Sequence, residues 1–188
     1  MKTKLFSAAL LTALIFLVQA DGAGAQTASL KAQNGFFKNL KKMCGQKFEG
    51  ATEFPTNPDH ALVGKRLLMT VATCTDKEIR IPFQVAEDKS RTWILTLTEK
   101  GLLFKHDHRH ADGTPDKITN YGGMAAAGGT KFIQKFPADA ETAALIPEAS
   151  TNVWTMQIDK QNKRFMYQLE RHGELRYRGY FNLKTPAK

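Results

Sequence analysis

The sequence predicts an all-β fold, a single antiparallel meander of about eight to ten strands that closes into a barrel behind one short N-terminal helix. Two observations carry this prediction. From residue 46 onward, apolar and polar residues alternate over successive short stretches, and clusters of Gly, Pro, Asn and Asp separate these stretches. An open sheet of that size would leave unpaired strand edges, and closure removes them. A two-sheet sandwich is the alternative that the same pattern allows.

Residues 1–25 are predicted to be a cleaved signal peptide. Two lysines precede an apolar run from Leu5 to Val18, which is short for a membrane-spanning helix. Ala23-Gly24-Ala25 then forms a small-x-small cleavage site that leaves Gln26 as the first mature residue; an earlier cut is the alternative. No later stretch is long and apolar enough to be an integral membrane segment. Residues 26–188 are therefore expected to form one soluble domain, in the periplasm or secreted from the cell.

The chain carries a formal net charge of +9 at pH 7. A basic surface favours anionic partners such as lipid head groups, polyanions or acidic small molecules. The charges are scattered along the sequence, so a general contribution to solubility is the simpler interpretation. Nucleic acid is not an expected partner, because no recognition motif accompanies the charge. Nothing in the sequence bears on the oligomeric state.

The chain has two cysteines, Cys44 and Cys74. In an oxidising compartment an even number of cysteines favours a disulfide. Such a bond would stabilise the fold by about 3 kcal/mol through closure of the loop. Two buried thiols are the alternative, and a metal site is less favoured because the C-x-x-C spacing is absent.

The first part of the mature chain is expected to be a helix followed by strands. A helix from Gly35 or Phe36 to Met43 would place Phe36, Leu40 and Met43 on one face, and a helix this short must pack on the protein body. Pro82 indicates an edge or a bulge within the third strand. The strands expected here cover residues 46–54, 65–74 and 79–85.

A central hairpin is predicted from Trp93 to Asp112. Leu102 and Phe104 continue the apolar face of the first strand after the Glu99-Lys100-Gly101 turn, and three alternating histidines follow on that face. If the turn centres on Glu99 and Lys100, the facing pairs are Leu97 with Leu102, Leu95 with Phe104, Trp93 with His106, and Arg91 with His108.

After the hairpin, a short strand is expected at residues 117–121 and a flexible glycine-rich loop at 122–129, either a lid or a plain connector. A strand at 130–136 and one helical turn within 137–146 follow, with Asp139 as its N-cap. Three more alternating stretches, ending near residue 183, complete the meander.

Leu40, Gly45, Phe48, Glu49 and Gly50 form a helix end followed by G-x-x-aromatic-E-G at the start of the first strand. This pattern resembles the entrance of lipocalin-like calycin barrels, which usually carry Trp where this chain has Phe48. The resemblance covers about a dozen residues directly. It implies an internal cavity for a small apolar or amphipathic ligand. It does not imply haem, because no residue here matches a haem-ligand motif.

Three further motifs are S-R-T-W at residues 90–93, K-H-D-H-R-H-x-D-G at 105–113 and N-V-W at 152–154. They resemble a family of small exported bacterial proteins with no assigned function. This resemblance covers most of the mature chain and implies no activity.

The histidine strand allows a metal site as one hypothesis. His106 and His108 lie two residues apart, roughly 6.5 Å along a strand, which suits chelation of zinc or copper. His110 lies too far along the strand to join them easily, so His60 or Asp112 would have to supply a third ligand. Arg91 opposite His108 is unfavourable for a metal.

Two other interpretations use the same strand without a metal. In the first, the histidines belong to a hydrogen-bonded structural network. In the second, Arg91, His108 and His110 form a cationic mouth for a carboxylate or phosphate head group, above an apolar floor. The candidate ligand-binding residues are Arg91, Trp93, Phe104, His106, His108 and His110.

No motif of a serine hydrolase, a zinc protease or a phosphate-binding loop occurs in the sequence. The sequence therefore favours an exported, non-enzymatic barrel that binds a small apolar or amphipathic, and in one version anionic, ligand. The alternative is a metal-binding protein or metal-dependent hydrolase that uses the His106/His108/His110 strand. A protein inhibitor or envelope-interaction module acting through the barrel loops is a weaker third hypothesis.

Overall fold

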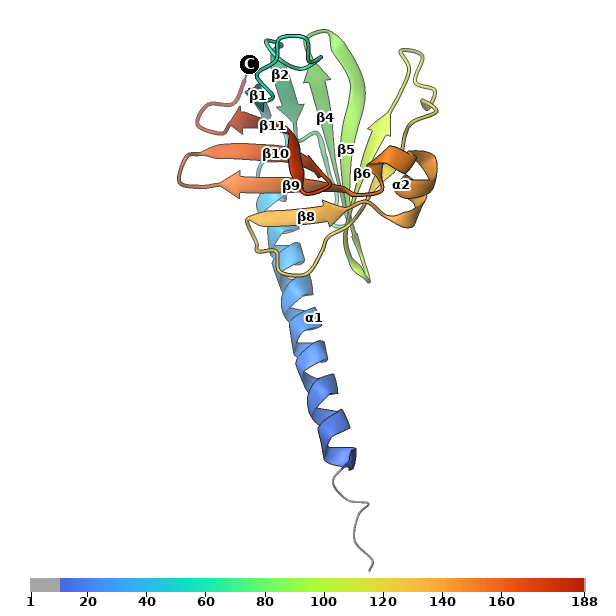
Figure 1. Cartoon of the computed structure of the whole chain (residues 1–188). Coiled ribbons are helices and arrows are strands. Elements are labelled where there is room, and N and C mark those ends of the chain that lie inside the picture. Colours follow the sequence, from blue (N-terminus) through green and yellow to red (C-terminus); the bar gives the residue numbers. More distant parts are fainter. Residues whose placement is uncertain (1–10, 188) are drawn as a thin grey trace, which may run out of the picture.

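The computed structural model describes residues 11–187, with side chains from residue 24 onward. Eleven strands form one antiparallel sheet that curls into a nearly closed barrel (Figure 1). The order around the barrel is β7-β6-β5-β4-β2-β1-β11-β10-β9-β8, and β3 pairs with β4 outside this path. The all-β barrel is thus confirmed, and it replaces the sandwich alternative. The strands are β1 (Lys47–Phe54), β2 (Leu67–Thr70), β3 (Thr73–Cys74), β4 (Glu78–Val85), β5 (Asp88–Thr98), β6 (Gly101–His108), β7 (Tyr121–Met124), β8 (Ile133–Pro137), β9 (Asn152–Asp159), β10 (Arg164–Arg171) and β11 (Glu174–Asn182).

The two end strands of the sheet, β7 and β8, meet at a seam that a few hydrogen bonds close. Ala126 N donates to Lys135 O at 2.8 Å, and Asp139 N donates to Gly122 O at 2.9 Å. The Thr142 hydroxyl also bonds both the N–H and the carbonyl of Gly122, at 2.7 and 2.8 Å. The short helix α2 (Ala140–Leu145) therefore holds the seam, and its predicted N-cap is confirmed because Asp139 accepts from Thr142 N at 2.8 Å.

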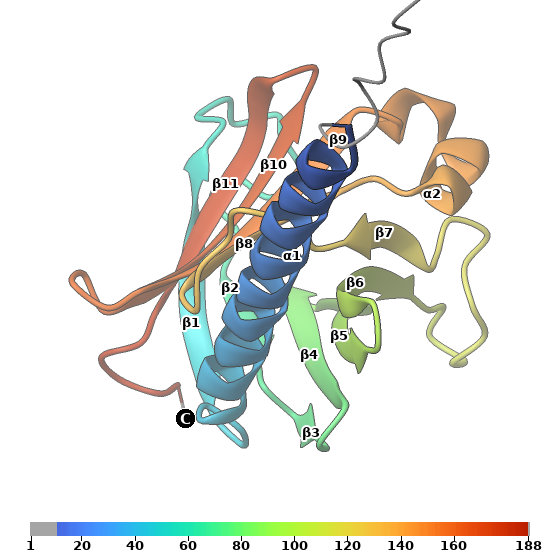
Figure 2. The ribbon, with the colours of Figure 1, turned by 90° about the horizontal axis from the view of Figure 1, so that it is seen from below.

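One end of the barrel is closed by the helix α1 (Leu11–Lys41), which crosses it in the view from below (Figure 2). Phe36, Phe37 and Leu40 are buried in the same core as the inward faces of the strands. The Gln33 side chain is buried as well, and its Oε1 accepts a hydrogen bond from Leu102 N at 2.9 Å. The apolar face that the sequence indicated thus packs into the barrel, as a short amphipathic segment must.

The helix α1 (Leu11–Lys41) begins much earlier than predicted and ends two residues before Met43. The prediction of its start was wrong because residues 24–34 favour helix by composition but show no apolar period. They need none, since α1 projects from the barrel and is exposed from Gly24 to Ala28 (Figure 1). Residues 1–23 of the predicted signal peptide lie outside the described side chains, and the signal peptide stays a prediction. Within the described residues, no helix combines the length and the apolar character needed to cross a membrane.

The disulfide between Cys44 and Cys74 is present, with a Cα–Cα distance of 6.2 Å. It joins the chain just after α1 to β3, and so fixes the helix against the barrel. A disulfide fits an oxidising location, extracellular or periplasmic.

The strand predicted for residues 65–74 is interrupted between β2 and β3. At the interruption, Val71 N donates to Gln46 O at 2.9 Å and Ala72 N donates to Arg80 O at 3.0 Å. Pro82 lies opposite this break, because β4 pairs Phe83 with Met69 and Arg80 with Thr73. The irregularity that Pro82 indicated is thus found opposite it, and also within β4 itself, where the register against β5 shifts between Phe83 and Val85. The strand β4 is not an edge strand.

The glycine-rich stretch after residue 121 is a loop only in its second half. Residues 121–124 form β7, residues 125–129 belong to no strand, and no strand covers 117–120. The strand predicted at 117–121 therefore lies later in the chain, and the predicted loop is shorter than 122–129. A Cβ atom on Gly122 would collide with the Phe104 carbonyl, and one on Gly123 with the Pro137 carbonyl. These glycines allow close approach of neighbouring backbones, to β6 at Gly122 and across the seam at Gly123, rather than flexibility. The next strand, β8, begins at Ile133 instead of residue 130.

Candidate functional site

The predicted register of the central hairpin is confirmed. Pairing of β5 with β6 sets Leu97 opposite Leu102 and Leu95 opposite Phe104. It also sets Trp93 opposite His106 and Arg91 opposite His108. The apolar half of this face lies near α1, and the half with Arg91 and the histidines lies toward the other end of the barrel.

At that other end, the barrel interior opens into a pocket of about 200 Å³. Strands from both halves of the sheet line it, together with the segment between β1 and β2. Four of the six predicted ligand-binding residues meet here, namely Arg91, Trp93, His106 and His108. The remaining lining residues are His60, Leu62, Phe83, Tyr121, Tyr167, Leu169 and Tyr177.

The structure places the other two predicted residues outside this pocket. Phe104 is fully buried beneath it, with its ring centroid 4.5 Å from that of His106. His110 is exposed and lies in a separate surface hollow beside Arg109 and Ser90. The face that holds Arg91 and His108 therefore ends before His110, where the chain leaves β6.

His106 is a structural member of the pocket wall. Its Nε2 lies 2.7 Å from the Tyr167 hydroxyl and its Nδ1 lies 3.1 Å from the Tyr121 carbonyl. Burial lowers its pKa to about 3, and the nearby His108 acts in the same direction. The ring is therefore neutral at pH 7, and Nδ1 carries the proton that the Tyr121 carbonyl accepts.

Arg91 and His108 form the polar part of the pocket. Arg91 Nη1 donates to the Asp88 carboxylate, the one hydrogen-bond partner that the described residues offer this guanidinium. Burial would raise the pKa of Asp88, but hydrogen bonds from Ser90 and Arg91 outweigh it and lower the pKa to about 2. Burial and the charge of Arg91 lower the pKa of His108. His108 is consequently neutral at pH 7, and its Nε2 lies 3.1 Å from the Tyr121 hydroxyl.

Aromatic side chains form the rest of the pocket, and sequence reasoning missed most of them. Trp93 stacks on Tyr167 with ring centroids 4.5 Å apart, and His60 stacks on Tyr177 at 5.8 Å. Burial raises the pKa of Tyr167, and it raises that of Tyr121 to about 12, so both hydroxyls stay protonated. The alternation of the last two strands placed Tyr167 and Tyr177 on the inward face, but only barrel closure brings that face to Trp93.

Three histidines of the metal hypothesis, His60, His106 and His108, line the same pocket, but they do not form a metal site. Among the described residues, no three His, Cys, Asp or Glu side chains are grouped as they would be to hold a metal ion. Both ring nitrogens of His106 already have protein partners. Binding of zinc or copper by His106 and His108 thus stays a prediction, and it would require these hydrogen bonds to break.

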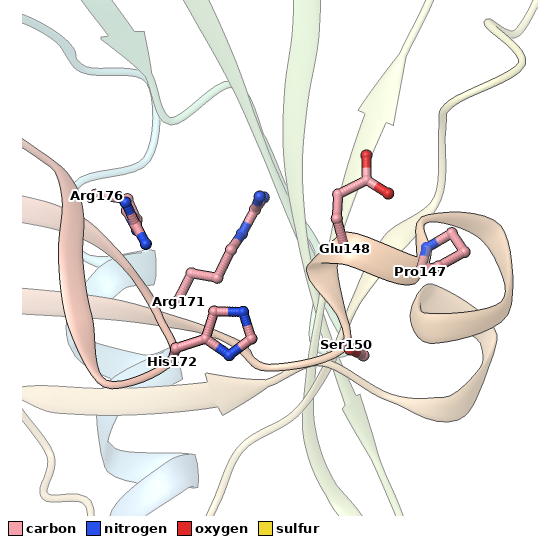
Figure 3. A pocket seen from close by; sticks show the side chains of 6 residues that line it. All are labelled: Pro147, Glu148, Ser150, Arg171, His172 and Arg176. Atoms are coloured by element: carbon pink, nitrogen blue, oxygen red, sulfur yellow. The ribbon is translucent and has the colours of Figure 1, made fainter.

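A second hollow, of about 470 Å³, lies between the β10–β11 hairpin and the segment after α2 (Figure 3). The arginine side chains that line it already bond to other residues of the protein. Arg171 Nε donates to Asn152 Oδ1 at 2.9 Å, and Arg176 pairs with Glu174 at 3.1 Å. His172 Nδ1 lies 3.1 Å from the Thr151 hydroxyl. This hollow is open and lacks the aromatic floor of the barrel pocket.

Comparison of this chain with protein-family models, with curated proteins and with solved structures found no match. The nearly closed antiparallel barrel with an N-terminal helix is compatible with a calycin-like fold. The argument for function therefore depends on the pocket itself.

Proposed function

We propose that this protein is an exported barrel that binds a small amphipathic ligand in the pocket at the end opposite α1. One observation carries the proposal. A guanidinium and an imidazole, from Arg91 and His108, stand beside a wall of aromatic rings that include Trp93, Tyr167 and Tyr177. Apolar pockets with a few convergent polar groups are the usual form of a small-molecule site.

The size of the pocket limits the ligand. At about 200 Å³, it is smaller than typical pockets for drug-sized molecules, which span roughly 300–1,000 Å³. A single ring or a short chain suits this space, and a planar ring would continue the stacking of Trp93 on Tyr167. Larger flat cofactors do not suit it.

The charges in the pocket favour an anionic head group over a cationic one. Asp88 accepts a hydrogen bond only from Nη1 of Arg91, and the Arg91 side chain is 31% exposed. The outer edge of a guanidinium can donate two parallel hydrogen bonds to a carboxylate. With His108 neutral, Arg91 supplies the positive charge, and Asp88 reduces its effect. We therefore infer a weakly held small carboxylate, such as an aromatic acid.

The two histidines and the tyrosines then act as hydrogen-bonding and packing groups, with no catalytic step assigned to them. The disulfide is consistent with export. Together these features favour a carrier or sensor of a small acid over a hydrolase.

Calorimetric titration with benzoate and with benzyl alcohol tests the proposal, because the two probes share a ring and differ in charge. Benzoate should bind more tightly, by about tenfold if one charge-assisted contact of about 1.4 kcal/mol separates them. Arg91→Gln should remove this difference. Arg66→Gln, at an exposed arginine paired with Glu49 outside the pocket, is the matched control. Equal binding of both probes by the wild-type protein, or no binding of either, would contradict the proposal.

A further inference from the structure

The two ends of the barrel differ strongly in charge, although the charges looked scattered in the sequence. We define the helix end as α1 from Gly24 together with the connecting segments gathered around it in Figure 2. Contacts tie these segments to the helix. Asn39 Nδ2 donates to Lys131 O at 2.8 Å, and Lys41 pairs with Asp76 at 2.8 Å. The β9–β10 turn joins the same end, because the Lys160 ammonium lies 5.0 Å from the centroid of the Phe132 ring.

Lysine dominates the charge of the helix end. Residues 24–46 and the connecting segments at 71–72, 75–77, 99–100, 125–132 and 160–163 contain nine lysines and two acidic residues. One of the two acids, Asp76, is already paired with Lys41. Among the described residues, the other eight lysines have no carboxylate partner, and all eight are exposed. The nine lysines are Lys31, Lys38, Lys41, Lys42, Lys77, Lys100, Lys131, Lys160 and Lys163.

The opposite end has the reverse balance. Its connecting segments, at 55–66, 86–87, 109–120, 138–151 and 172–173, contain seven acidic and four basic residues. The pocket opens at this end. The positive charge of the protein is thus displaced to the end that α1 closes.

We propose that the helix end docks on an anionic lipid bilayer, with its lysines against phosphate head groups and the pocket facing away from the membrane. Lysines near such a surface add their attractions, which fall off over a Debye length of about 8 Å at physiological salt. The predicted signal peptide is not needed for this docking, because all nine lysines lie after residue 26.

A bilayer suits the helix end better than a soluble polyanion for two reasons. First, α1 projects from the barrel at this end (Figure 1), and its N-terminal part overlaps the apolar run of residues 5–18. If that run enters a membrane during export, the helix end is the part of the barrel that faces the membrane. Second, a groove of about 590 Å³ runs beside α1 and is lined by Lys31, Lys38 and Lys131 with small residues between them. Such a groove can bind a single lipid head group, whereas a long polyanion would need a continuous row of basic residues.

Vesicle flotation with the protein as purified after export tests this docking. Vesicles of mixed phosphatidylglycerol and phosphatidylcholine should bind it, and pure phosphatidylcholine should not. Binding should weaken by at least about tenfold between about 0.01 M and about 0.5 M salt, as the Debye length shrinks from roughly 30 Å to a few Å. The triple variant K31E/K38E/K131E should lose most of the binding. K65E/K89E/K117E, at three exposed lysines away from the helix end, makes the same change in net charge and should keep it.

Three outcomes would overturn the proposal. One is failure of the wild-type protein to bind the anionic vesicles at low salt. Another is an equal loss of vesicle binding in the two triple variants, which would indicate that binding depends on net charge and not on a particular face of the protein. The third is binding to soluble heparin but not to vesicles, which would assign the lysines to a polyanion. Circular dichroism melts of both variants establish that each is folded.

Discussion

The Nε2 atom of His106 lies 2.7 Å from the hydroxyl oxygen of Tyr167, and this contact joins β6 to β10 across the interior of the barrel. These strands are not neighbours in the sheet. The pair therefore links two walls of the pocket through one buried hydrogen bond. Its loss should therefore affect both the free energy of unfolding and ligand binding in the pocket.

The first prediction concerns acid stability and follows from the pKa of His106. Burial lowers this pKa to about 3 from an ordinary value of 6.5, so between these two pH values the unfolded chain binds a proton that the folded protein excludes. Proton uptake by His106 in the unfolded chain therefore favours unfolding increasingly as the pH falls. Stability should be full above pH 6.5 and should fall progressively toward pH 3, by on the order of 2 kcal/mol at pH 4.5.

Urea unfolding at pH 7 and pH 4.5 measures this effect, with His106→Gln as the test variant and His110→Gln as the exposed control. The test variant should be less stable at pH 7 but lose less stability on acidification than the wild-type protein. If both variants lose as much as the wild-type protein does, His106 is not the titrating group.

The second prediction concerns Tyr167→Phe. Removal of the hydroxyl leaves the buried Nε2 of His106 without its partner and should cost about 1–3 kcal/mol. Thermal melts measure the loss. Tyr180→Phe, on the same hairpin and half-buried, is the control and should change stability by less than about 0.5 kcal/mol. If Tyr167→Phe leaves the stability unchanged, water readily replaces the hydroxyl as the partner of His106.

The local part of this site was predictable from the sequence and the long-range part was not. The register of Arg91 with His108 follows from strict alternation and a short turn, which involve neighbouring residues only. The role of Tyr167 depends on barrel closure, and so does the strand at Gly122 and Gly123. Small residues favour loops when considered alone, but here Gly122 permits close approach to the backbone of β6, and Gly123 permits close approach across the seam. The length of α1 escaped prediction because a projecting helix needs no apolar face.

The third prediction tests that seam. Gly123→Ala would place a Cβ atom against the Pro137 carbonyl and 3.1 Å from Asp139 N, and backbone atoms cannot move aside cheaply. We expect a loss of at least about 2 kcal/mol and faster hydrogen exchange in β7 and β8. Gly128→Ala, where a Cβ atom would meet nothing within 4 Å, should cost only about 1 kcal/mol through its positive φ. Equal effects at the two positions would mean that the 122–129 stretch is mobile after all.

The fourth prediction concerns the disulfide that fixes α1. Reduction, or Cys44→Ala with Cys74→Ala, should lower the free energy of unfolding by about 3–4 kcal/mol, because the bond closes a separation of 30 residues. The loss should appear first as faster hydrogen exchange beside the disulfide, at Gly45 N, which donates to Val71 O at 2.7 Å, and at Val71 N, which donates to Gln46 O at 2.9 Å. Uniform loss of protection over the whole barrel would contradict a local role.

The last prediction concerns Asp88, which holds Arg91 and competes with an anionic ligand for it. Its pKa of about 2 keeps it ionised over the physiological range, so Asp88→Asn should release part of the guanidinium charge. The asparagine carbonyl can still accept from Ser90 N, which Asp88 Oδ1 now does at 2.9 Å, so the turn should persist. Benzoate affinity should rise by about three- to tenfold, whereas benzyl alcohol binding should not change. A fall in benzoate affinity would mean that Asp88 instead positions Arg91 for the ligand, and calorimetry on the same two probes separates these cases.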